Sequence, residues 1–123
     1  MGEATVASEN ASGMATRIGT PSKPIWSKTK EFSSTGNAFK HWKDHGKEFP
    51  GIQNSKQYVE SAWKFRDRTD VLIKVRANGE RIIYDHPNNT FGVFTRTGVP
   101  KTMFRPIDGI KKFNDQKGIP YGN

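Results

Sequence analysis

The dipeptide Asn78-Gly79 is the strongest hairpin signal in the chain, and it constrains the C-terminal half to contain an antiparallel strand pair. Segments rich in β-branched and aromatic residues flank it. Two more such segments follow, separated by the turn residues Thr97-Gly98 and ended by Pro106. The expected strands are residues 71–77, 81–85, 90–96 and 101–105. Consecutive strands joined by short turns predict a four-stranded antiparallel meander.

Helical periodicity precedes these strands. We expect one helix with Asn37 as its N-cap, running to Phe49 and ended by Pro50-Gly51. A second helix is expected from Ser55 to about Asp67. The predicted apolar faces consist of Phe39, Trp42, Gly46 and Phe49 on the first helix and Tyr58, Val59, Ala62 and Phe65 on the second. This order predicts an α+β fold, with two N-terminal helices packed on one face of a twisted four-stranded antiparallel sheet.

The two ends of the chain have weaker patterns. Residues 1–35 are rich in Ser, Thr, Ala and Gly and predict a flexible N-terminal segment or linker, which leaves residues 36–123 as one folded domain. Ile25, Trp26 and Phe32 are exceptions, because their side chains could dock on the core. Residues 109–117 predict a short helix or turn, and the tail from residue 120 to 123 is expected to be loose.

The chain is strongly basic, with 20 Lys and Arg against 12 Asp and Glu and a net charge of +8. Such a charge can serve solubility alone. It also suits a nucleic-acid partner, which we favour, because basic surfaces gain affinity by releasing counterions from phosphates. The absence of cysteine excludes disulfides, thiol nucleophiles and cysteine-ligated zinc. No apolar run has transmembrane or signal-peptide character. If the protein is exported, we expect the signal to lie elsewhere, on a larger parent chain.

His41 and His45 stand one helical turn apart and are two of the three histidines in the chain. Three interpretations stay open: a structural role on the helix, a metal pair joined by His86, and general acid–base work on phosphate esters. In a continuous helix Asp44 and Glu48 point away from His45. One helix therefore cannot aim all these side chains at one ion, and no metal site is predicted.

Other polar residues are candidates for contacts with phosphate or base. The candidate substrate contacts are Lys43, Lys47, Tyr84, Asn89, Lys101 and Arg105, and Arg96 and Thr102 are candidates for the reaction itself. Cations beside a hydroxyl can clamp a phosphoryl oxygen, but they also occur on any solvated strand face. Tyr84 is equally suited to the core and to stacking on a base, and an Asn in a turn often serves the backbone.

Residues 41–49 follow the pattern His, aromatic, two residues, His-Gly, one residue, Glu-Phe. The pattern continues with Tyr58, Ala62 and Phe65, then Phe91-Gly92-Val93, Thr97-Gly98 and Thr102-Met103-Phe104-Arg105-Pro106. This ordered series, over about residues 37–117, resembles the C-terminal ribonuclease domains of contact-dependent growth inhibition and related polymorphic toxins. The resemblance implies the fold shared by barnase, EndoU, colicin and RelE-like ribonucleases, in which a helical N-terminal part packs on a twisted antiparallel sheet.

The resemblance also implies chemistry. It implies an endoribonuclease without metal or cofactor, which cleaves RNA, with tRNA as the candidate, through attack of a ribose 2′-hydroxyl on the adjacent phosphate. His45 matches the catalytic helix histidine of the pattern, His41 the second histidine and Thr102 the strand threonine. Arg96 is expected to stabilise the developing charge. Asp44 departs from the pattern, where a Lys commonly precedes the His-Gly pair, so a neighbouring lysine is expected to hold the phosphate instead.

Partners and location follow from the same resemblance. It implies an acidic immunity protein that covers the basic cleft. It also implies export as part of a larger toxin and delivery to the cytoplasm of a target cell. The residues alone leave two alternatives, a metal-dependent nuclease using His41 and His45 and a non-catalytic basic module that binds nucleic acid.

Overall fold

A side-chain cap sets the start of the first helix. In the computed structural model, which describes residues 24–121, α1 (Ser34–His45) follows Ser33, whose hydroxyl accepts a hydrogen bond from the Gly36 N–H at 3.1 Å. The predicted cap at Asn37 is wrong. Asn37 lies inside the helix, is buried, and donates from its side-chain amide to a carbonyl of the preceding segment. The hydroxyl at position 33 satisfies the free N–H groups of the first turn before the chain reaches Asn37.

The first helix also ends earlier than predicted. A 3-10 turn, η1 (Gly46–Glu48), follows His45, so the α-helix does not continue to Phe49. By contrast, α2 (Ser55–Arg66) begins where expected, because the Asn54 side chain accepts a hydrogen bond from the first turn at 2.9 Å. Its buried stripe is confirmed and is extended by Trp63.

The sheet has five strands rather than the four predicted. They are β2 (Leu72–Val75), β3 (Arg81–Asp85), β4 (Thr90–Phe94), β5 (Pro100–Phe104) and β6 (Ile119–Pro120), in the order β5-β4-β3-β2-β6 with every neighbouring pair antiparallel. The meander from β2 to β5 is confirmed. The added strand pairs Ile119 with Val75 and Pro120 with Lys74, so residue 120, the first of the tail predicted to be loose, belongs to a strand. Pro120 lacks an N–H group, which an edge strand tolerates.

The β2–β3 and β4–β5 hairpins each close through a tight turn at a glycine. Gly79 between β2 and β3 has φ 89°, and Gly98 between β4 and β5 has φ 93°, a region that side chains with a Cβ rarely adopt. Each glycine N–H donates to the carbonyl three residues earlier, to Arg76 at 2.9 Å and to Thr95 at 2.8 Å. The hairpin predicted at Asn78-Gly79 is thus confirmed.

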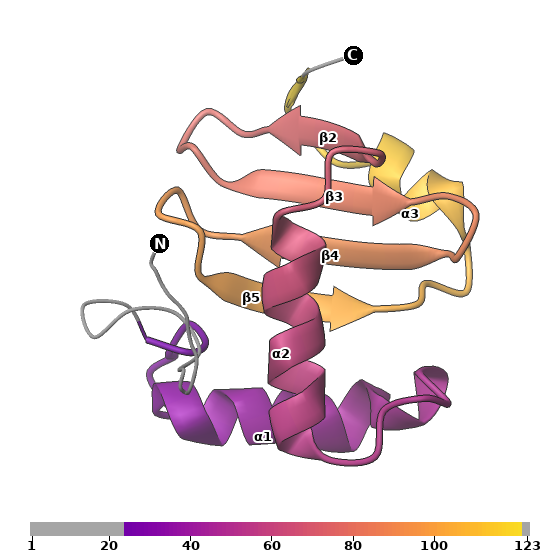
Figure 1. The fold of residues 1–123 in the computed structure, drawn as a ribbon. Helices are drawn as coiled ribbons and strands as arrows, with labels where there is room; N and C mark the ends of the chain where they lie inside the picture. The colour runs from indigo at the N-terminus through magenta and orange to yellow at the C-terminus, as the bar shows by residue number, and fades with distance from the viewer. Residues whose placement is uncertain (1–23, 122–123) are drawn as a thin grey trace.

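The helices lie on different sides of the sheet (Figure 1). In this view α2 crosses one face, α1 runs beneath β5 at the edge, and α3 (Ile110–Asn114) lies behind the sheet. The short helix or turn predicted for residues 109–117 is α3. The core therefore has two parts. The part under α2 includes Tyr58, Phe65, Phe94 and Met103, and the part under α3 includes Ile82, Tyr84, Phe91 and Phe113. Within residues 24–121 no helix is long and apolar enough to cross a membrane.

Trp26 anchors the segment before α1 to the core. Its side chain is fully buried, it stacks on Tyr58 with 5.4 Å between ring centroids, and its Nε1 donates to the Lys101 carbonyl at 3.2 Å. Trp26, which the sequence allowed to dock from the segment predicted to be flexible, is thus a core residue, and the packed part of the chain includes residues before 36. Residues 1–23, the rest of the segment predicted to be flexible, lie outside the described residues.

Candidate active site

Both histidines of α1 face the edge of the sheet at β5. They are partly buried, and their ring centroids lie 6.1 Å apart. Phe39, which was expected on the apolar face, is 51% exposed instead. The buried face of α1 is rotated toward the histidines because Trp26 packs against His41, with 5.5 Å between their ring centroids.

A carboxylate holds His45 in place. The Nδ1 atom of His45 lies 2.8 Å from Glu48 Oε2. Because an ionised carboxylate only accepts hydrogen bonds, this contact places a proton on Nδ1 and leaves Nε2 for another partner. The prediction that Glu48 points away from His45 is wrong, since η1 is a 3-10 turn in which residues i and i+3 eclipse. Gly46 permits the close packing here, because a Cβ at this position would lie 2.3 Å from the Trp42 ring.

The end of β5 fixes Glu48 in turn. Its Oε1 accepts a hydrogen bond from the Arg105 N–H at 2.7 Å, and Arg105 Nη1 donates to the Glu48 carbonyl at 3.0 Å. The Arg105 guanidinium also lies over the Phe49 ring, 4.8 Å from its centroid. Arg105, predicted to contact substrate, thus positions the carboxylate that orients His45.

His41 occupies a different environment. Its Nδ1 lies 3.4 Å from Thr102 Oγ1, a long contact in which either group can donate. Burial lowers the pKa of His41, and the positive charges of His45 and Lys40 lower it further, against the opposite influence of Asp44. His41 therefore favours the neutral form, which can accept a proton.

Phe104 completes this group of residues. Its ring stacks on His45 with 5.2 Å between centroids and 27° between planes, and it is partly exposed. Thr102 and Phe104 are two residues apart on β5, and such residues point to the same face of a sheet. The same alternation associates Phe104 with Thr102 in the sequence, although Phe104 is not among the predicted site residues.

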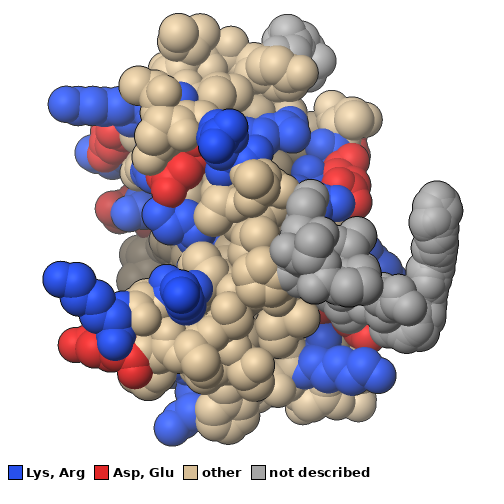
Figure 2. Space-filling model, turned by 90° about the vertical axis from the view of Figure 1, so that its left-hand side faces the viewer, with Lys and Arg blue, Asp and Glu red and all other residues tan. Residues whose placement is uncertain are grey.

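Two of the predicted cations lie near the turns of the hairpins. The Arg96 side chain covers Gly79, so it stands between the β2–β3 and β4–β5 turns. Lys101 pairs with Glu80 at 2.5 Å, and Arg76 holds the other oxygen of the same carboxylate at 2.7 Å. Figure 2 shows the side of the molecule where these turns lie: Lys and Arg are dispersed over it, and Asp or Glu stand beside several of them. Positive charge on this face is therefore partly neutralised by neighbouring acids.

The lysines of the first helix and η1 differ in their surroundings. Lys43 is directed to the exposed ring of Phe39, 5.9 Å from its centroid, and so faces away from the histidines. Lys47 is exposed in η1, between His45 and Glu48 in sequence, and its ammonium has no hydrogen bond or ion pair with another residue of 24–121. The ammonium of Lys47 is therefore the better candidate of the two for a contact with phosphate.

Tyr84 and Asn89 have structural roles. Tyr84 is 1% exposed beneath Phe113 of α3, and its hydroxyl donates to Asn89 Oδ1 at 2.6 Å. The Asn89 amide donates to the Pro106 carbonyl at 2.9 Å. These contacts hold the loop that leads to α3, and Tyr84 has no free ring face for a base.

The third histidine lies apart from the pair. His86 is exposed at the β3–β4 turn, with its ring 5.8 Å from that of Tyr84. Across residues 24–121, no three His, Cys, Asp or Glu side chains are grouped in a way that could hold a metal ion. The ligand set considered from the sequence, His41, His45 and His86, is therefore not brought together.

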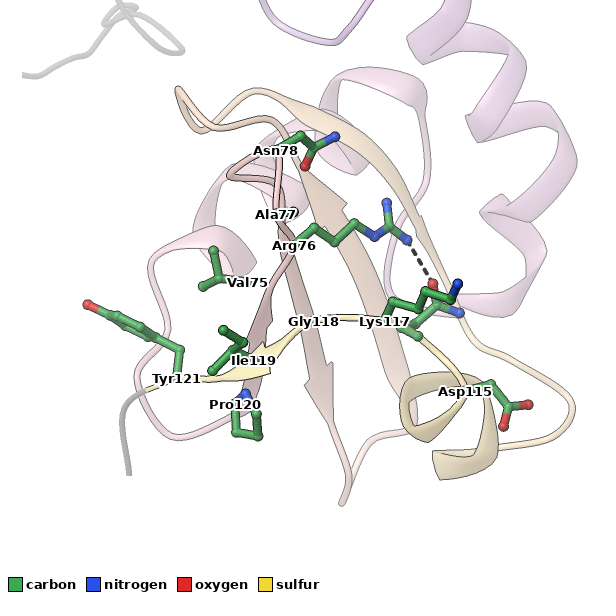
Figure 3. Close-up of a pocket in the computed structure, with 11 residues that line it drawn as sticks. Val75, Arg76, Ala77, Asn78, Asp115, Lys117, Gly118, Ile119, Pro120 and Tyr121 are labelled. Carbon is green, nitrogen blue, oxygen red and sulfur yellow. Dashed lines mark hydrogen bonds between the residues drawn. The ribbon is translucent and has the colours of Figure 1, made fainter.

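A cavity of about 1170 Å³ lies at the other end of the sheet, beside β6 (Figure 3). Arg76 reaches across it to Gln116 Oε1 at 2.7 Å, and Ile119 and Tyr121 form part of its wall. No histidine lines this cavity. The group with acid–base capacity is instead the cluster at β5, which we call the histidine site; it consists of His41, His45, Glu48, Thr102, Phe104 and Arg105.

The chain matches no protein-family model and no curated protein sequence. Among solved structures, a ribonuclease from Escherichia coli in complex with its inhibitor protein is similar, with a TM-score of 0.46 and 10% sequence identity. The match covers 63% of this chain and 95% of that chain. This is a distant similarity of fold.

Proposed function

We propose that this protein is an endoribonuclease that cleaves RNA by transesterification, without a metal ion. The observation that carries the proposal is the pair of imidazoles at β5, whose centroids lie 6.1 Å apart in unlike environments. Glu48 orients one ring, while burial lowers the pKa of the other. Paired titratable groups in unlike surroundings are suited to separate acid and base roles. RNA carries its own nucleophile beside the scissile bond, so these two groups and a few cations suffice.

Each histidine has one proton to move in this reaction. His41 takes the proton of the ribose 2′-hydroxyl, and the 2′-oxygen forms a bond to the adjacent phosphorus. The bond from phosphorus to the 5′-oxygen breaks, and His45 delivers a proton to that oxygen from Nε2. Glu48 accepts the hydrogen bond from Nδ1 of His45 and so fixes the orientation of the ring during the transfer. The products are a 2′,3′-cyclic phosphate and a 5′-hydroxyl.

The phosphate requires donors around it as charge develops. Thr102 stands next to His41 and would donate to a phosphate oxygen, and Lys47 would supply positive charge beside His45. The sequence suggested Arg96 for stabilising this charge. Its side chain lies over Gly79 at the hairpin turns, so Lys47 takes this role here.

The histidine variants test this assignment. His41→Asn and His45→Asn should each lower kcat/KM about 100-fold or more, the usual range for loss of a general acid or base. His86→Asn is the matched control, since it removes the remaining histidine and leaves the site intact. All three should keep the circular dichroism spectrum of the wild type. Equal loss in all three variants, or full activity of His45→Asn, would refute the assignment.

A metal chelator and a modified RNA test the reaction mechanism. Cleavage should persist in excess EDTA, leave cyclic phosphate ends and fail on an RNA with 2′-deoxy at the cut site. Activity that disappears in EDTA and returns with zinc or magnesium would establish a metal-dependent nuclease instead. Binding of RNA without any product would establish a non-catalytic binding module.

We further propose that the chain is the toxic tip of a larger exported protein and acts on RNA, tRNA in particular, in the cytoplasm of a target bacterium. The support is the resemblance of residues 37–117 to toxin ribonuclease domains, together with the net charge of +8. That charge suits an acidic immunity protein, because opposite charges speed association.

Expression inside bacteria should arrest growth, and His45→Asn should relieve the arrest. A small acidic protein encoded beside this chain should bind it and block cleavage; its failure to do so would remove the immunity proposal.

A further inference from the structure

α3 is fixed on the face of the sheet opposite α2. The Phe113 ring stacks on Tyr84, with 6.1 Å between centroids. The Lys74 ammonium donates to three carbonyls at the end of this helix, those of Phe113, Asn114 and Gln116, at 2.9–3.1 Å. Cations at this end of a helix interact favourably with its free carbonyls. The short helix is therefore a rigid support for its own side chains.

Lys112 of α3 is directed to the histidine site. Its ammonium lies 5.9 Å from the centroid of Phe104 and 5.8 Å from that of Phe91. The Phe104 ring also stacks on His45. One partly exposed aromatic ring therefore contacts both the Lys112 ammonium and the imidazole of His45.

The charge of Lys112 is not neutralised by an acid within residues 24–121. Lys111, the neighbouring residue, pairs with Asp115 at 2.7 Å, and Lys101 on β5 pairs with Glu80. The Lys112 ammonium has no hydrogen bond or ion pair inside the described part of the chain, and its contacts are with the two rings. A phosphate that approaches Phe104 can meet this ammonium without displacing a carboxylate.

We propose that Lys112 binds a backbone phosphate of the RNA next to the scissile bond, with Phe104 as the surface that separates this contact from His45. The inference rests on the proposed function and adds the residue that holds the chain beyond the histidine pair. A compact, hydrated ammonium on a flexible stem suits such a phosphate contact. The resulting binding site runs from α1 across β5 to α3.

The salt dependence of binding tests this contact without requiring cleavage. The probe is a short single-stranded RNA of mixed sequence with every 2′-hydroxyl methylated, so that the proposed nucleophile is absent. Binding is measured from about 50 to 200 mM salt, the range over which phosphate contacts change affinity strongly. Lys112→Ala should reduce the slope of log affinity against log salt by about 0.7, the value for one phosphate contact on a single strand. Lys112→Arg should retain the wild-type slope.

Lys111→Ala is the matched control, since it removes a lysine from the same helix whose charge is already paired. Its slope should equal that of the wild type. With a cleavable RNA, Lys112→Ala should raise KM about tenfold and leave kcat nearly unchanged. Equal slopes for the two alanine variants would overturn the Lys112 proposal even if the wild type cleaves RNA. An RNA-binding wild type that never cleaves would refute the nuclease and leave the slope comparison decisive for Lys112.

Discussion

Trp26→Ala should lower the free energy of unfolding by about 4–5 kcal/mol. The side chain is fully buried. A buried Trp removes about 150–250 Å² from water, which corresponds to about 4–6 kcal/mol at about 25 cal/mol per Å². Truncation of a core Trp to Ala typically costs about 3–5 kcal/mol. Loss of the indole N–H would also leave the Lys101 carbonyl without this partner, a further cost of about 1 kcal/mol. The loss is a large part of the 5–15 kcal/mol that stabilises a typical domain.

Urea unfolding followed by far-ultraviolet circular dichroism measures this change. Phe39→Ala is the control, since Phe39 is an aromatic residue of α1 that is 51% exposed, and it should cost less than about 1 kcal/mol. Trp26→Phe should fall between the two, because it keeps a ring against Tyr58 but loses the hydrogen bond. If Trp26→Ala is within about 1 kcal/mol of the wild type, Trp26 is not a core residue and the segment before residue 36 acts as a linker.

Three further predictions concern the site and the sheet. Glu48→Gln should lower kcat about 10- to 100-fold with little change in KM, because His45 loses the charge that orients it; an unchanged kcat would remove Glu48 from the site. Acidification below the ordinary histidine pKa of about 6.5 should reduce the free energy of unfolding. Folding lowers the pKa of His41, so His41 is protonated more readily in the unfolded chain than in the folded one. This loss should level off below the folded pKa and be absent in His41→Asn, as measured by urea unfolding at several pH values; an equal loss in that variant would contradict it. Gly79→Ala should cost about 1–2 kcal/mol because φ is 89°, whereas Gly51→Ala, where a Cβ would meet nothing within 4 Å, should be neutral; equal thermal midpoints would refute this reasoning.

Local chemistry explains why the meander could be predicted. Two of the three hairpins turn at a glycine with φ near 90°, Gly79 and Gly98, and the β3–β4 hairpin turns through residues 86–89, where Asn89 has φ 49°. Asn54 caps α2 by a contact within a few residues. Such signals depend on the neighbours in the chain, so they can be identified before the fold is known.

The buried face of α1 and the fifth strand differ from the prediction because distant segments meet there. The buried face of α1 depends on Trp26, which docks from outside the helix against His41. The fifth strand forms only because the tail meets β2, where Val75 pairs with Ile119. Neither contact falls within about 15 residues of sequence, so periodicity could not place Phe39 or the residues of β6 correctly.

The candidate site divides in the same way. The sequence by itself determined that His41 and His45 share a helical face, because a spacing of four residues is nearly one turn. The tertiary structure decided what surrounds them: Arg105 holds Glu48 beside His45, and Thr102 and Phe104 come from β5. The periodicity of a helix places residues along one element. The environment that sets each histidine's charge, orientation and burial comes from segments that become neighbours only when the chain packs.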